Sequence, residues 1–292
     1  LHFTGRTWRP PYEANSVIIQ ATSGCTYGKC RFCSLYKDEC FRMSPMEEFE
    51  EDLAEIKSYQ PYARRIFWTG ANPFAMSYEN LKLRALTVRD YLIKCQTMAM
   101  FAGIRDIKNK EVWQLKKLRA MGINGLTIGT ESGDDDTLAL AGKGYTAADI
   151  LEQCRRLDRA GIRYSFFYLT GISGAGRGED GAKATAAVCN QLHPALIGAN
   201  MLTIYPDSKL YEEIQHGNWK EESETEKYRE VRALVERLEI PTEFAALGAS
   251  NAFQLHGVLP EDKEKLLAFL DDVIKNVGED ELRRYRESVH HL

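Results

Sequence analysis

The sequence predicts an α/β fold, a partial (β/α)6 TIM-like barrel with a mostly helical C-terminal extension. Six apolar segments that fit β-strands alternate with segments that fit helices. The apolar runs are continuous and alternate with helices, which is typical of a parallel sheet with helices outside it. Six units are too few for a closed eight-fold barrel. We expect an extended lead-in at 1–15, a (β/α)6 core at 16–206 and an extension at 207–292 that covers the barrel.

The order of the elements follows from apolar runs and from the residues that start and stop them. Ser44, Pro45 and Glu47 are typical of a helix start, and Gly122 and Gly161 are typical of a helix end. The expected strands are 16–20, 65–69, 97–101, 125–130, 164–169 and 196–205, and the helices between them are 44–59, 78–95, 109–121, 147–160 and 180–192. In the extension we expect helices at 219–238, 260–277 and 279–290, with 244–259 irregular or a short strand. Ligands of such folds bind at the carboxyl ends of the strands.

Composition limits the classes of function. The 292 residues are 44% hydrophobic and 10% aromatic, so the chain can bury a large core. Its net charge of −4 and pI of about 6.0 argue against nucleic acid as a partner. We find no run of 18 apolar residues and no signal peptide, so we expect a cytoplasmic protein without a membrane partner. Seven cysteines, an odd number, suit a reducing compartment.

Three cysteines in one loop carry the chemistry. Cys25, Cys30 and Cys33 have the spacing C-x4-C-x2-C directly after the first expected strand. A closed zinc or ordinary iron–sulfur site takes four protein ligands. Three thiolates on a four-iron cluster leave one iron open to a small molecule, and we expect a [4Fe-4S] cluster here. A zinc knuckle or three unrelated thiols is the alternative, and the remaining cysteines fit core or surface positions: Cys40, Cys95, Cys154 and Cys189.

These cysteines, with an aromatic residue before the third, resemble those of the radical SAM enzymes. Most members have three residues between the first two cysteines, whereas this chain has four. The resemblance implies that S-adenosylmethionine (SAM) binds the open iron and is cleaved to methionine and a 5′-deoxyadenosyl radical. That radical then removes a hydrogen atom from the substrate. It also implies an external electron donor of the flavodoxin or ferredoxin type.

The resemblance further implies residues that bind SAM. Phe32 is expected beside the adenine, the turn Gly70-Ala71-Asn72 beside the methionyl ammonium, and Glu131 on the ribose hydroxyls. Ser165 and Ile172 resemble the segment that lines adenine and ribose, and Leu202 is the candidate from the last strand. Plain alternatives exist, since 70–73 also fits an ordinary turn. The three aspartates after Gly133 fit a helix start.

The substrate is the least determined feature of the sequence. Polar side chains in expected loops and at a strand end are the candidate substrate contacts, although surface ion pairs fit them equally: Arg9, Glu13, Tyr36, Tyr168 and Asn251. We expect a small-molecule substrate, and a lyase that acts on queuine or a related modified 7-deazapurine is one candidate. The alternatives are an RNA- or tRNA-modifying radical SAM enzyme and a non-catalytic iron–sulfur or zinc module.

Overall fold

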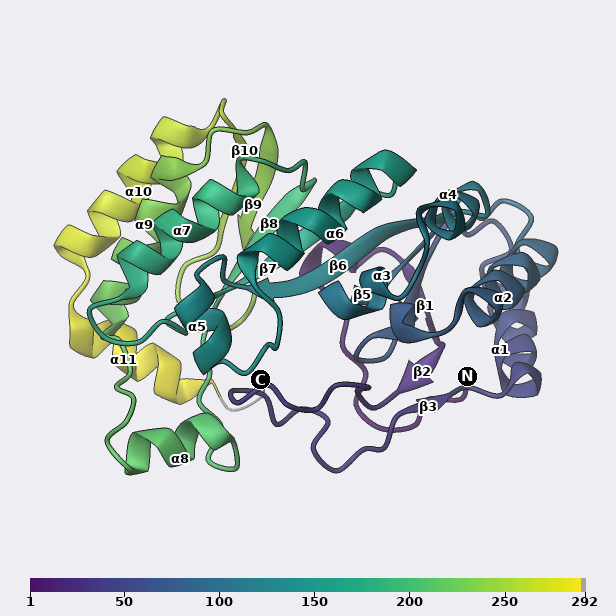
Figure 1. The fold of residues 1–292 in the computed structure, drawn as a ribbon, viewed down its shortest axis with the longest axis horizontal. Helices are drawn as coiled ribbons and strands as arrows, with labels where there is room; N and C mark the ends of the chain where they lie inside the picture. The colour runs from purple at the N-terminus through teal and green to yellow at the C-terminus, as the bar shows by residue number, and fades with distance from the viewer. Residues whose placement is uncertain (290–292) are drawn as a thin grey trace. The chain divides into compact units, whose positions relative to one another are not determined.

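The computed structural model describes residues 1–289, and it has an α/β fold with an eight-stranded, mostly parallel sheet (Figure 1). The predicted α/β class is therefore confirmed. The chain divides into two compact units. The first comprises Leu1–Gly28, Leu35–Gly129 and Gln153–Tyr164, and the second Lys29–Ser34, Thr130–Glu152 and Ser165–Leu292. The domain limits that we expected from the sequence stay a prediction, and residues 290–292 lie outside the described part.

The first unit contains four strands of the sheet in the order β1-β4-β5-β6. All three pairings are parallel, with Val17 opposite Ile66, Arg65 opposite Thr97 and Met98 opposite Ile123. Its elements are η1 (Pro11–Glu13), β1 (Val17–Gln20), β2 (Thr22–Ser23), β3 (Arg42–Met43), α1 (Met46–Tyr59), β4 (Arg65–Thr69), η2 (Pro73–Ala75), α2 (Tyr78–Tyr91), β5 (Thr97–Ala102), α3 (Ile104–Lys108), α4 (Val112–Ala120), most of β6 (Ile123–Glu131) and the second part of α6 (Ala147–Ala160).

The core of the first unit forms around Trp68, which is fully buried in β4. The ring of Phe49 on α1 meets it edge-on, with centroids 5.9 Å apart. Phe49, Leu53 and Ile56 are spaced by four and three residues, so they share one face of α1, and all three are buried. Burial of each such side chain stabilises the fold by roughly 1.5–3 kcal/mol. This core positions the carboxyl end of β4.

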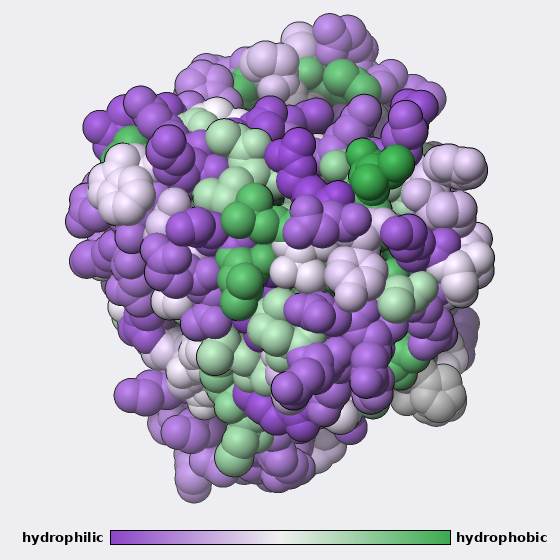
Figure 2. All heavy atoms as spheres, turned by 90° about the vertical axis from the view of Figure 1, so that its right-hand side faces the viewer, coloured by the Kyte–Doolittle hydropathy of each residue, from purple (hydrophilic) through white to green (hydrophobic). Residues whose placement is uncertain are grey.

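The outer helices of the first unit present a mostly hydrophilic surface. Figure 1 shows α1, α2 and α4 beside one another, and α2 contacts both of the others. Figure 2 shows this side of the molecule, where hydrophobic side chains interrupt a largely hydrophilic surface. Exposed apolar residues of these elements include Leu83, Leu86 and Trp113. Scattered exposed apolar side chains are normal on a globular surface.

The second unit contains the strands β7-β8-β9-β10 in that order. The first two pairings are parallel and the last is antiparallel, with Leu255 opposite Ala246. In Figure 1, α7, α9 and α10 run side by side, in agreement with their contacts. Its elements are the first part of α6, α5 (Asp135–Leu140), β7 (Tyr164–Thr170), α7 (Gly178–Cys189), β8 (Leu196–Met201), α8 (Lys209–Gln215), α9 (Glu224–Arg237), β9 (Thr242–Ala246), β10 (Leu255–Leu259), α10 (Lys263–Asn276) and α11 (Glu279–Ser288).

Two parts of the sequence prediction differ from the structure. The segment expected as irregular or a short strand holds both β9 and β10, so the C-terminal extension adds two strands to the sheet. The last core strand ends at Met201 rather than Tyr205, and a turn in which the Ser208 N–H donates to the Tyr205 carbonyl at 2.9 Å follows it. A third prediction agrees with the structure, since the aspartates after Gly133 start a helix. The Asp134 carboxylate accepts the Thr137 N–H of α5 at 2.9 Å.

Candidate functional site

The cysteine loop leaves the small β2 strand through a conformation that only glycine adopts easily. Gly24 has φ +67°, and a Cβ atom there would lie 2.6 Å from the Cys40 carbonyl. All three cysteines of the loop are half-buried thiols without a disulfide. The Tyr27 N–H donates to Cys25 Sγ at 3.4 Å, and the Cys33 N–H donates to the Cys30 carbonyl at 3.3 Å.

The remaining cysteines differ from the loop in environment. Cys40 is exposed, whereas Cys95, Cys154 and Cys189 are buried, as expected for surface and core thiols. Burial raises the pKa of Cys95 to about 11 and that of Cys189 to about 12. Thiols with raised pKa values stay protonated and are poor metal ligands. Across residues 1–289, no three His, Cys, Asp or Glu side chains gather as the ligands of a single ion.

The turn after β4 has specific contacts within the first unit. Gly70 has φ +132°, and a Cβ atom there would lie 2.1 Å from Thr22 Oγ1. Glycine is thus required by the close approach of β2. Ala71 is half-buried. The buried Asn72 side chain donates to Thr26 Oγ1 at 2.6 Å and to Asp106 Oδ2 at 3.1 Å, so this predicted cofactor residue contacts the cysteine loop itself.

Three of the predicted cofactor residues come together in the second unit. Ile172 and Leu202 are buried in one apolar cluster with Ala141, Leu210 and Trp219, and Phe32 packs against that cluster half-buried. The Leu202 N–H donates to the Thr170 carbonyl at 2.9 Å, which fixes the chain just beyond β8. Phe32 is therefore less buried than Ile172 and Leu202.

Glu131 is a strained residue with a charged partner that the sequence reading missed. It is the one residue other than glycine in the described chain with a positive φ, at +65°. Its carboxylate accepts from Lys143 Nζ at 3.2 Å, and Lys143 lies 5.7 Å from the centroid of the Phe32 ring. Burial disfavours the Lys143 ammonium, but Tyr145, Glu131 and Cys30 outweigh it and raise the pKa of Lys143 well above its ordinary value. Lys143 is therefore a buried cation beside the predicted cofactor residues.

Strand β7 separates two of the predicted residues. Ser165 is half-buried, whereas Tyr168 is buried and its hydroxyl donates to the Glu230 carboxylate of α9. Residues three apart in a strand point to opposite faces, so both cannot face one ligand. Tyr168 faces helix α9, and its role as a substrate contact stays a prediction that this arrangement does not favour.

A pair of buried acids lies behind the loop that carries Ile172. The Glu230 carboxylate also accepts the Gly171 N–H at 2.7 Å. A Cβ atom on Gly178 would lie 2.3 Å from Glu222 Oε1 and 2.8 Å from Glu230 Oε2, so the two carboxyl groups are close neighbours. Burial and the charge of Glu230 raise the pKa of Glu222 to about 10. Glu222 is thus neutral at pH 7 in the folded protein.

The predicted substrate contacts of the first unit have partners of their own. The Arg9 side chain donates to the Ser16 carbonyl at 2.8 Å. The buried Glu13 carboxylate accepts from Arg65 Nε at 2.9 Å and also from Ser16. Arg65 begins β4, so Glu13 lies at the amino end of that strand. Tyr36 is half-buried, and its carbonyl accepts the Glu39 N–H at 3.2 Å.

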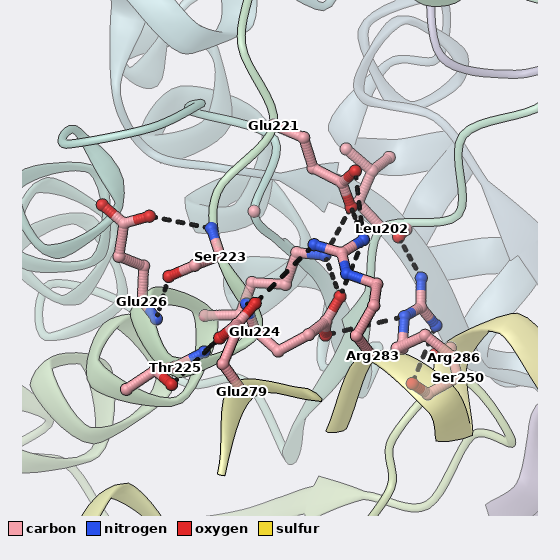
Figure 3. Close-up of polar contacts among 12 residues, drawn as sticks. Leu202, Glu221, Ser223, Glu224, Thr225, Glu226, Ser250, Glu279, Arg283 and Arg286 are labelled. Carbon is pink, nitrogen blue, oxygen red and sulfur yellow. Dashed lines mark hydrogen bonds and ion pairs between the residues drawn. The ribbon is translucent and has the colours of Figure 1, made fainter. Parts of the chain in front are cut away.

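Asn251, the last predicted substrate contact, lies in a loop that helix α11 holds in place. Its side-chain amide donates to the Ala199 carbonyl at 3.2 Å, and its Oδ1 atom is buried without a hydrogen-bonding partner. Figure 3 shows Arg286 of α11 between this loop and the end of β8. Arg286 donates to the Ser250 carbonyl at 2.9 Å and to the Leu202 carbonyl.

The same helix joins a buried ionic network at the start of α9 (Figure 3). Arg283 lies 3.3 Å from both Glu221 and Glu224, and Arg286 Nε lies 3.8 Å from Glu224. The fully buried Lys227 donates to Glu224 at 3.0 Å. The C-terminal helix is therefore tied by charge to the loops at the carboxyl end of β8.

The chemistry of the cysteine loop fits an iron–sulfur cluster. Three thiols in one loop are the donors that such a cluster takes. One of them, Cys25, accepts a backbone N–H bond, the type of contact that stabilises cluster sulfur. The half-buried Phe32 and the strained Glu131 fit the binding of an adenosine group.

Comparisons with known proteins identify relatives of this chain. The sequence profile described as the Radical SAM superfamily matches residues 19–179, more than half of the chain. The heme chaperone HemW of Bacillus subtilis (strain 168) is 24% identical over 139 residues, which cover 46% of this chain and 36% of the chaperone. In length, the matched part spans little more than a third of that relative.

Solved structures resemble this fold at low sequence identity. The radical SAM methyltransferase TsrM from Kitasatospora setae, solved with cobalamin and a [4Fe-4S] cluster bound, superposes with a TM-score of 0.57 and 16% identity over 69% of this chain and 37% of its own. Methylornithine synthase (PylB) superposes with a TM-score of 0.54 and 15% sequence identity, over 92% of this chain and 85% of its own. HydG, a maturase of the [FeFe]-hydrogenase, superposes with a TM-score of 0.54 and 16% sequence identity, over 79% of this chain and 51% of its own.

The fold defines the class as α/β proteins of the TIM-like partial-barrel type. The match over more than half of its residues shows the family: the chain belongs to the radical SAM superfamily. Its cofactors are those of the superfamily, a [4Fe-4S] cluster and SAM. No described helix has the length and apolar character needed to cross a membrane.

Proposed function

We propose that Cys25, Cys30 and Cys33 hold the [4Fe-4S] cluster and that the chain abstracts hydrogen from a small-molecule substrate. The observation that carries this proposal is the three-cysteine loop inside the matched region 19–179. When bound, the cluster and SAM supply a 5′-deoxyadenosyl radical by one-electron reductive cleavage, with methionine as the other product. The electron comes from an external donor of the flavodoxin or ferredoxin type.

The protein's own residues position the reactants. The half-buried Phe32 offers an apolar surface for the adenine, and the buried Ile172 and Leu202 of the cluster that it packs against support it from behind. Glu131 accepts hydrogen bonds from the ribose hydroxyls, with Lys143 fixing its carboxylate. Within the second unit, Ser165 is a further proposed SAM contact, and Gly70 and Ala71 of the first unit stay candidates from the sequence resemblance.

Metal content and SAM cleavage test the proposal together. Anaerobically reconstituted protein should hold about four irons and form 5′-deoxyadenosine from SAM with dithionite as reductant. Alanine at Cys25, Cys30 or Cys33 should abolish both, whereas alanine at Cys40, an exposed cysteine close in sequence, should retain both. A single zinc without colour would support the non-catalytic alternative. A full cluster without SAM cleavage would overturn catalysis.

The substrate is proposed as a small molecule held near Asn251, whose Oδ1 atom is a buried acceptor without a partner in the described chain. A lyase acting on queuine or a related modified 7-deazapurine is the candidate that the sequence resemblance offers. Incubation of the reconstituted enzyme with SAM, reductant and queuine should yield a fragmented base. The net charge of −4 predicts no mobility shift of bulk tRNA at moderate salt, and a shift would favour the RNA-modifying alternative.

A further inference from the structure

The four-residue spacer between Cys25 and Cys30 is joined to two adjacent residues of α3, to Arg105 directly and to Asp106 through Asn72. Thr26 and Tyr27 follow Cys25 directly. Asp106 reaches Thr26 through Asn72, and Arg105 lies over Tyr27. All of these residues belong to the first compact unit. A short helix after β5 is therefore linked to two successive residues of the cysteine loop, once directly and once through Asn72.

The Asn72 amide makes the first of these contacts with both of its ends. Its Oδ1 accepts the Thr26 N–H at 3.3 Å, and its Nδ2 donates to Thr26 Oγ1 at 2.6 Å. The same Nδ2 donates to Asp106 Oδ2 at 3.1 Å. Asn72 is only 8% exposed, so each of these bonds replaces water that the buried amide has lost. One side chain thus fixes both the backbone and the hydroxyl of Thr26.

Asp106 is itself held rigidly. Its carboxylate accepts the Gly103 N–H at 2.7 Å, which closes the first turn of α3. Its carbonyl accepts from the buried Lys110 ammonium at 3.0 Å, and Lys110 also donates to the Phe74 carbonyl at 2.7 Å. Because Phe74 follows Asn72 by two residues, Lys110 joins α3 to the turn that carries Asn72.

The second contact is a stacked cation. The Arg105 guanidinium carbon lies 3.9 Å from the centroid of the Tyr27 ring, within the range of a cation–π interaction. Tyr27 in turn donates its backbone N–H to Cys25 Sγ. The position of the sulfur atom is therefore coupled to Arg105 through Tyr27 and to Asp106 through Asn72 and Thr26.

We propose that Asn72, Asp106 and Arg105 form a clamp that orients Cys25 for the cluster, which makes them positioning residues. This inference rests on the proposed function, in which Cys25 is a cluster ligand. A longer spacer gives a cysteine loop more conformational freedom, and ordering it costs backbone entropy at every added residue. Contacts to Thr26 and Tyr27 before the cluster arrives offset part of that cost. Removal of such outer contacts typically lowers metal affinity about 10–100-fold.

The test compares two asparagines of equal burial. Asn72→Ala removes the clamp, and Asn124→Ala is the matched control. Asn124 is also 8% exposed and lies in the same unit, near the amino end of β6. Its Oδ1 accepts the Arg163 N–H at 2.8 Å. Both variants lose a buried hydrogen bond to backbone. Only the Asn72 variant loses contact with the cysteine loop.

Alkylation of the apoprotein gives a readout that does not depend on the cluster. In Asn72→Ala, iodoacetamide should modify Cys25 about tenfold faster than in wild type, with Cys33 unchanged, when the sites are mapped by mass spectrometry. Asn124→Ala should leave both rates unchanged. Equal Cys25 rates in Asn72→Ala and Asn124→Ala would overturn the clamp, whatever the metal content.

Cluster stability gives the second readout. After reconstitution, the rate at which a chelator removes iron should rise at least tenfold in Asn72→Ala and in Arg105→Ala, but not in Asn124→Ala. Thr26→Ser keeps the hydroxyl and should resemble wild type, whereas Thr26→Val should resemble Asn72→Ala. If wild type holds no cluster, the proposed function fails. If wild type holds one and the variants lose iron no faster, only the clamp fails.

Discussion

Lys143 Nζ lies 3.2 Å from Glu131 Oε1, and this buried pair joins the end of β6 to the loop after α5. Glu131 keeps a left-handed backbone, φ +65°, that costs a non-glycine residue of order 1–3 kcal/mol. Strain of this kind persists where surrounding contacts determine it, and it is frequent at functional sites. The pairing thus supports Glu131 as the residue that receives a ligand.

The first prediction concerns this pair. Glu131→Gln keeps the shape but loses the charge, and a hydrogen bond to a charged group contributes about 1.5–3 kcal/mol. SAM affinity, measured by calorimetry on the reconstituted protein, should fall about 10–100-fold. Lys143→Met should lower the SAM affinity by a similar factor, because the Glu131 carboxylate loses the ammonium that orients it. Lys183→Met, which removes an exposed lysine paired with Asp180 at 3.0 Å, should leave the affinity unchanged.

The second prediction concerns Gly70. Its φ of +132° is unfavourable for other residues, and a Cβ atom would lie 2.1 Å from Thr22 Oγ1. Gly70→Ala should lower the free energy of unfolding by about 2–4 kcal/mol, from overpacking and backbone strain together. Gly161→Ala is the control, since Gly161 also has a positive φ of +71° but no atom within 4 Å of the added Cβ. It should cost only about 1 kcal/mol in urea unfolding, and equal losses would contradict the close approach of Thr22.

The third prediction gives a pH dependence with a definite sign. In the folded protein the pKa of Glu222 is about 10, against an ordinary value of 4.5, so the folded state binds one more proton between these values. The free energy of unfolding should therefore fall as pH rises from about 5 toward 9, by up to roughly 1.4 kcal/mol per pH unit. Glu222→Gln carries no charge and should flatten this slope. A slope equal to that of wild type would show that another group causes it.

The sequence predicts the fold well where helices cover strands on both faces. In an α/β chain, short continuous apolar runs such as 65–69 and 164–169 indicate buried parallel strands. The strands β4 and β7 form at these positions. The strands β9 and β10 were harder because their apolar content is weaker. Residues 255–259 do alternate between buried and exposed, and that period of two was the available signal.

The candidate site is only partly predictable, because the spacing of a sequence motif indicates which residues are candidates but not which side chains they contact in the fold. The cysteine loop and the apolar set of Phe32, Ile172 and Leu202 follow from position along the chain. Lys143 was missed, although its place between two glycines marks an unusual turn. Tyr168 and Asn72 show a second limit. A strand face or a hydrogen bond to another loop decides what such a side chain contacts, and neither is visible in one sequence.

The last prediction concerns Arg286, which ties α11 to the end of β8 and to the loop that holds Asn251 (Figure 3). Arg286→Leu removes the hydrogen bonds to the Ser250 and Leu202 carbonyls, and a hydrogen bond from a charged group contributes about 1.5–3 kcal/mol. We expect faster proteolysis within residues 247–254, detected by mass spectrometry of limited digests. Arg232→Leu breaks exposed ion pairs with Glu236 and with Asp271 and should cost at most about 1 kcal/mol. If both variants are digested at the wild-type rate, α11 does not hold the loop.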